Sequence, residues 1–70
     1  MIWERSENAY YAVVTGLDDK VRFRMIVEST DDGWDWSTWY PAAEPRIAPS
    51  YGVAATVQDA MREAEGATQN

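Results

Sequence analysis

The residues best suited to acid–base or metal chemistry are two small aspartate clusters in turn-like segments. One is Asp18-Asp19, and the other is Asp31-Asp32 with Asp35 close by. Paired carboxylates can divide general acid and base roles, and their oxygens can bind Ca²⁺. Turns at the two ends of one strand lie on the order of 25 Å apart, so the clusters cannot form one active site. The second cluster lacks the spaced ligands and final glutamate of a calcium loop. We therefore favour ordinary turn acids and expect no metal.

Two residue types that carry much of enzyme chemistry do not occur in this sequence. It contains no cysteine and no histidine in 70 residues. This excludes Cys/His zinc sites, Ser-His and Cys-His nucleophile pairs, and histidine general bases. We expect a protein that is not an enzyme, with no catalytic residues and no cofactor.

The charge balance is acidic and bears on the choice of partner. Twelve aspartates and glutamates outnumber six lysines and arginines, which gives a formal net charge of −6. Binding to phosphates relies on cations, so direct binding to nucleic acid or to anionic lipid is disfavoured. A negative surface is attracted to basic proteins, including those that bind nucleic acid themselves. The same charge also serves solubility alone, and both interpretations stay open.

Neither end of the sequence has the pattern of a sorting signal. Residues 1–5 show no basic stretch followed by an apolar run, and apolar runs such as residues 9–14 are too short to cross a bilayer. We expect a cytoplasmic protein that does not enter membranes.

Alternating and β-branched residues predict three strands, over residues 9–15, 21–28 and 34–40. Short turns between them favour an antiparallel meander, with residues 3–6 as a lead-in. Residues 41–50 contain all three prolines and are expected to form a loop, with an edge segment near Arg46-Ile47.

One helix is expected after this loop. Thr56 is a suitable N-cap, with Asp59 three residues later. Apolar residues follow at helical spacing: Val57, Ala60, Met61 and Ala64. Gly66 should end the helix, and residues 66–70 should fray. The sequence thus predicts one α+β domain over residues 1–70, a three-stranded antiparallel meander with one C-terminal helix packed on one face.

A short helix covers only one face of such a sheet, so the other face should expose side chains. Its expected members are Arg22, Arg24, Ile26, Trp39 and one of the pair Tyr10-Tyr11. Protein interfaces favour tryptophan, tyrosine and arginine at their energetic centres. In the alternative interpretation, the arginines stack on the aromatic rings and pair across strands with Glu28 and Asp35.

The second half of the chain has a pattern of residues that is similar to one in other small proteins. Trp34-Asp35-Trp36 is followed, after the loop, by a Gly52-x-Ala54-x-Thr56 segment and then by Ala60 and Ala64 at helical spacing. This pattern resembles small bacterial and prophage β-β-β-α proteins, although the proline-rich loop is longer than their usual connection. The resemblance implies the fold and a phage-related origin, and it carries over no functional residue.

Two functions are expected from these features. In the first, the chain is a non-catalytic protein-binding module, a phage-encoded inhibitor that presents acidic groups to a nucleic-acid-binding complex, similar to anti-CRISPR proteins. In the second, it is a structural or self-associating accessory domain that uses its aromatic sheet face to form a homodimer or to dock. The helix acids also fit a plain solvated face. The residues expected at the partner contact are Asp31, Asp32, Asp35 and Trp39, with Glu63 and Glu65 on the helix.

Overall fold

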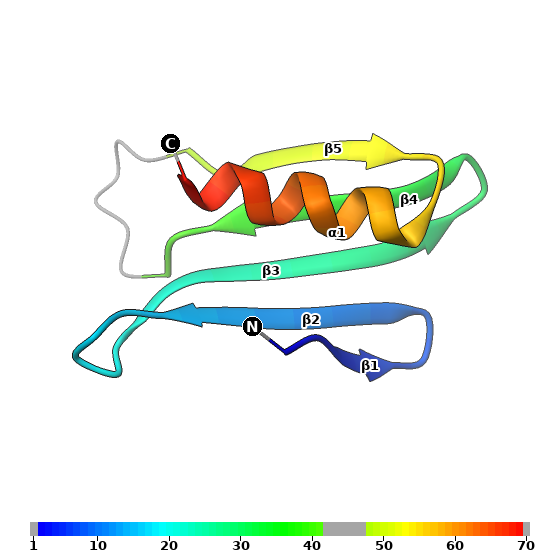
Figure 1. Ribbon diagram of the computed structural model, residues 1–70. Coiled ribbons are helices and arrows are strands. Elements are labelled where there is room, and N and C mark those ends of the chain that lie inside the picture. Colours follow the sequence, from blue (N-terminus) through cyan, green and yellow to red (C-terminus); the bar gives the residue numbers. More distant parts are fainter. Residues whose placement is uncertain (1, 42–47, 70) are drawn as a thin grey trace.

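Within the residues that the structure describes, five antiparallel strands form one sheet in chain order, and a single α-helix follows them (Figure 1). The computed structural model describes residues 2–41 and 48–69. The elements are β1 (Glu4–Ser6), β2 (Ala9–Thr15), β3 (Val21–Thr30), β4 (Gly33–Trp39), β5 (Ser50–Ala54), helix α1 (Val57–Gly66) and a 3-10 turn, η1 (Ala67–Gln69). The α+β class is confirmed, but the prediction of three strands is wrong, because the sheet has five.

The three central strands follow the predicted pattern closely. The β2–β3 turn is held by a hydrogen bond from the Gly16 amide to the Lys20 carbonyl, at 2.9 Å. The Asp18 carboxylate accepts from the Lys20 amide at 3.2 Å, and Asp19 adopts a positive φ of 61°. Both acids of the first aspartate cluster therefore have a structural role, since Asp side chains commonly bond the backbone two residues later and tolerate this conformation.

The first additional strand, β1, pairs with β2 along one edge of the sheet. It has only three residues, all polar or charged and exposed, so it carries no alternating apolar signal. It turns into β2 through Glu7, whose φ of 52° is unusual for a glutamate. Trp3, just before β1, packs against both buried clusters of the core. This long-range contact holds the N-terminal segment in place, and no local sequence pattern predicts it.

The second additional strand, β5, pairs with β4 along the other edge. Gly52 lies at its centre, and glycine normally weakens a strand. Here the missing side chain is needed, because a Cβ at position 52 would lie 2.8 Å from the Trp36 indole nitrogen. The strand thus depends on packing against a neighbour that is distant in sequence. The edge segment expected near Arg46-Ile47 lies outside the described residues.

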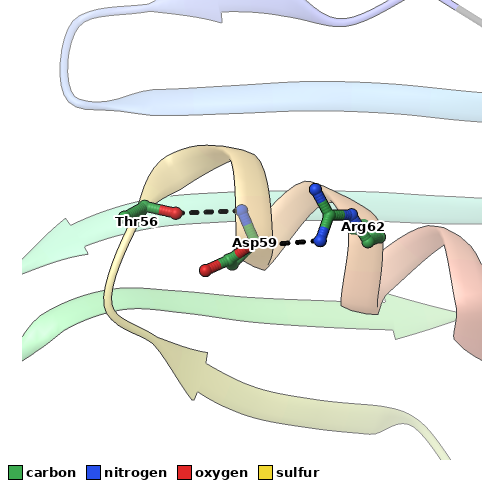
Figure 2. Close-up of polar contacts among 3 residues, drawn as sticks. All are labelled: Thr56, Asp59 and Arg62. Carbon is green, nitrogen blue, oxygen red and sulfur yellow. Dashed lines mark hydrogen bonds and ion pairs between the residues drawn. The ribbon is translucent and has the colours of Figure 1, made fainter.

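The helix α1 packs on β3, β4 and β5 on one face of the sheet and runs roughly along the strand direction (Figure 1). Ala60 and Ala64 are completely buried, and their small side chains let the helix approach the sheet closely. As expected, Thr56 caps the helix: its side-chain oxygen accepts from the Asp59 amide at 3.1 Å (Figure 2). Asp59 in turn forms an ion pair with Arg62 at 3.4 Å.

The core lies between α1 and the sheet. Met25 and Val27 on β3 are its largest fully buried side chains. Trp36 contacts both halves of the core, and Trp34 packs against the half around Val27. Phe23, on the same face, instead packs edge-on against Tyr40 at a centroid distance of 5.6 Å.

A short 3-10 turn follows α1. The helix ends at Gly66 and residues 67–69 form η1, while Asn70 lies outside the described residues, so the fraying of residues 66–70 stays a prediction. The Thr68 hydroxyl donates to the Glu65 carbonyl at 2.7 Å, which satisfies one of the free carbonyls at the helix end.

Candidate protein-binding surface

The face of the sheet opposite α1 is covered by no element of the described residues (Figure 1). The strand register arranges its side chains in three rows that run across the strands. The basic row is Val13, Arg24 and Trp39. The central row is Glu4, Tyr11, Ile26, Ser37 and Tyr51. The acidic row is Ser6, Ala9, Glu28, Asp35 and Val53. We call this surface, with Ile2 and Arg22 at its margins, the open face.

Large apolar side chains extend across the open face. Tyr51 and Val53 on β5 are 79% and 57% exposed, and Tyr11 on β2 is 42% exposed. Ile2 and Val13 are also exposed, and with Tyr11 they line a shallow hollow of about 380 Å³ near β1. Exposed apolar side chains that gather on one face mark candidate interaction sites, so the open face is a candidate binding surface.

Three charged side chains of the open face, Arg24, Glu28 and Asp35, lie in its outer rows, while Glu4 lies at the β1 end of the central row. Arg24 lies opposite Trp39, and Glu28 lies opposite Asp35. The expected cross-strand pairing of arginines with Glu28 and Asp35 therefore does not occur. Two carboxylates directly opposite each other on one face instead destabilise the sheet slightly.

Two of the predicted contact residues, Asp31 and Asp32, lie in the β3–β4 turn at one end of the sheet and are exposed. The Thr30 hydroxyl organises this turn, accepting from the Asp32 amide at 3.3 Å and donating to the Gly33 carbonyl at 3.2 Å. Gly33 has a φ of 140°, and a Cβ there would lie 2.5 Å from the Ala54 carbonyl oxygen. The turn thus needs glycine at this position.

The two predicted helix residues have different environments. Glu63 is exposed on α1. The Glu65 carboxylate accepts a 2.9 Å hydrogen bond from the Trp3 indole nitrogen and is partly buried. Glu65 therefore links α1 to the segment before β1.

The six predicted contact residues lie in three separate places. Asp35 and Trp39 belong to the open face, Asp31 and Asp32 to the β3–β4 turn, and Glu63 and Glu65 to the helix layer on the opposite side. The prediction that Trp39, Ile26 and one of the pair Tyr10-Tyr11 lie on the uncovered face is confirmed, and the tyrosine there is Tyr11. Sequence reasoning missed Tyr51, Val53 and Ile2. The signal for Tyr51 and Val53 was the alternation of residues 50–54, which Gly52 obscured, whereas no local pattern marks Ile2.

Residues 2–41 and 48–69 contain no cluster of three or more acidic side chains placed to hold a metal ion. Within the same residues, no helix has the length and apolar character that crossing a membrane requires.

Comparison of the chain with protein families, with curated proteins and with solved structures found no match. The resemblance to prophage β-β-β-α proteins therefore stays a prediction.

Proposed function

We propose that this protein is a non-catalytic protein-binding module whose binding surface is the open face. The observation that supports the proposal is the central row, whose apolar members Tyr11, Ile26 and Tyr51 lie between rows that carry charged side chains. An apolar centre with a polar rim is the usual anatomy of a protein interface. Tyrosine and tryptophan bury much area at low conformational cost, which makes Trp39 and Tyr51 suitable anchors.

A second candidate function is inhibition of a basic nucleic-acid-binding complex by acidic mimicry. Four exposed carboxylates lie at the β3–β4 end of the sheet: Glu28, Asp31, Asp32 and Asp35. Among the described residues, the one ion pair joins Arg62 to Asp59, so these four have no cationic partner there. A basic partner would supply the positive charge that these carboxylates lack.

Affinity capture separates the two candidates. The tagged protein is incubated with a nuclease-treated bacterial lysate, washed at low and at high salt, and the retained proteins are identified by mass spectrometry. An apolar interface should survive high salt, whereas charge mimicry should lose its partner as salt screens the contact.

Matched variants locate the contact. The double variant Tyr51→Thr/Val53→Thr removes exposed apolar area and places at both positions threonine, a β-branched residue that suits a strand. The variant Leu17→Ser removes a fully exposed apolar side chain away from the open face and serves as the control. The proposal predicts loss of captured protein with the first variant only. Equal capture by both would contradict it, and loss with Asp31→Asn/Asp32→Asn would favour the second candidate.

A further inference from the structure

We infer that the open face is the contact surface between two copies of this chain, which stack face to face with their strands antiparallel. This inference rests on the proposed function, because it names the occupant of the surface proposed there. The observations that carry it are the distribution of charge over the three rows, the sizes of the side chains in them, and the area of the face.

The charges of the open face are opposite on its two sides. On β3, Arg24 belongs to the basic row, Ile26 to the central row and Glu28 to the acidic row, at equal spacing. A two-fold axis that runs along the central row exchanges the two outer rows. It therefore places Arg24 of each copy over Glu28 of the other, so symmetry creates two ion pairs. Each pair would also offset the unfavourable approach of Glu28 to Asp35.

The same operation brings together side chains that fit by size and chemistry. Val13 falls over Ala9, so a larger side chain meets a small one. Trp39 falls over Asp35, whose carboxylate can accept the indole N–H. Along the axis itself, the apolar residues of the central row meet their own copies and form the centre of the interface.

Charge also determines the orientation of the two copies. An axis parallel to the strands would place Arg24 over Arg24 and Glu28 over Glu28, and like charges in contact weaken association strongly. Stacked sheets keep their strand directions within about 30° of each other, which the antiparallel arrangement allows. Its one like-charge contact is Glu4 with its own copy, at the rim beside β1, where water screens the repulsion.

A second copy suits the open face because this surface is nearly neutral. It contains Arg22 and Arg24 against Glu4, Glu28 and Asp35, so it accounts for one unit of the net charge of −6. Two copies would thus meet through a surface that holds little of their acidity. The two longer dimensions of the molecule, 36 and 24 Å, frame an area on the order of 800 Å², which is what each partner contributes to a standard interface.

The test measures the molar mass of the purified protein by light scattering and sedimentation equilibrium from low to high micromolar concentration. The wild type should pass from its monomer mass of 7.9 kDa to twice that value. Arg24→Glu and Glu28→Arg should each weaken association about a hundredfold, because each replaces two attractive contacts by two repulsive ones. Association should return in an equimolar mixture of the two variants, and in the double variant Arg24→Glu/Glu28→Arg, because both restore opposite charges.

Circular dichroism confirms that each variant is folded, and the rescue by mixing cannot be explained by misfolding. A wild type that stays monomeric throughout the range would overturn the inference. The inference would also be overturned if the wild type dimerises and both charge-reversal variants associate as strongly as it does. That result would indicate edge-to-edge pairing through β1 or β5. If a monomer still captures a protein partner through Tyr51 and Val53, the proposed function stands and only the identity of the occupant is wrong.

Discussion

At the scale of single residues, two similar side chains close together in the sequence can have different roles, and the degree of burial distinguishes these roles. Glu63 and Glu65 both lie near the end of α1, where an acid interacts unfavourably with the helix dipole. Within residues 2–41 and 48–69, a compensating contact is found for Glu65 alone, the hydrogen bond from the Trp3 indole. We therefore assign Glu65 to the stability of the fold.

Replacing Glu65 by alanine should lower the free energy of unfolding by about 1–2 kcal/mol, because the hydrogen bond between Trp3 and Glu65 is charge-assisted and partly buried. Glu63→Ala is the matched control and should cause no loss, since Glu63 is exposed. Urea denaturation of both variants measures the difference. Equal stabilities would show that the contact between Trp3 and Glu65 contributes nothing.

Two glycines should respond in opposite ways to the same substitution. Gly52→Ala should cost about 1–3 kcal/mol, because its Cβ would overlap the Trp36 indole in a packed layer. Gly66→Ala should stabilise the protein by up to about 1 kcal/mol, since Gly66 is helical and nothing lies within 4 Å of a Cβ there. Thermal unfolding should show the two melting temperatures on opposite sides of the wild type. If both melting temperatures shift in the same direction, the packing of Gly52 against Trp36 described here is wrong.

At the scale of elements, the sequence predicts what depends on local pattern and misses what depends on distant contacts. The alternation in β3 and the cap and spacing of α1 are local, and all of these are confirmed. The strands β1 and β5 form because Trp3 and Gly52 contact residues far away in the sequence. Trp39 could be assigned to the open face because β4 has a local alternating pattern. Tyr51 and Val53 could not, because β5 depends on a distant contact.

The cap of α1 provides a test at this scale. Thr56→Ala removes the side-chain oxygen that accepts from the Asp59 amide and should cost about 1 kcal/mol. For a domain of this size, that corresponds to a fall in melting temperature of roughly 4–8 °C. Gln58→Ala, at an exposed helical position, is the control and should leave the melting temperature almost unchanged. A similar fall in both variants would show that the loss in Thr56→Ala does not come from the cap.

At the scale of the whole molecule, the fold separates two kinds of surface. The helix layer and the turns carry most of the acidity, while the open face combines apolar side chains with charges that nearly cancel. A small domain has only one layer of core, here between α1 and the sheet, so the second face of the sheet has no partner within the described residues. The proposed function follows from this asymmetry.

Hydroxyl-radical footprinting tests most directly whether the open face is a protein interface. The reaction is run at low and at high protein concentration, and again with any captured partner added. Tyr11 and Tyr51 report on the open face, and the fully exposed Leu17 in the β2–β3 turn is the internal reference. We predict that both tyrosines become several times less reactive when the surface is occupied, while Leu17 does not change. If the reactivity of both tyrosines, relative to that of Leu17, is the same under every condition, the open face is not a protein interface.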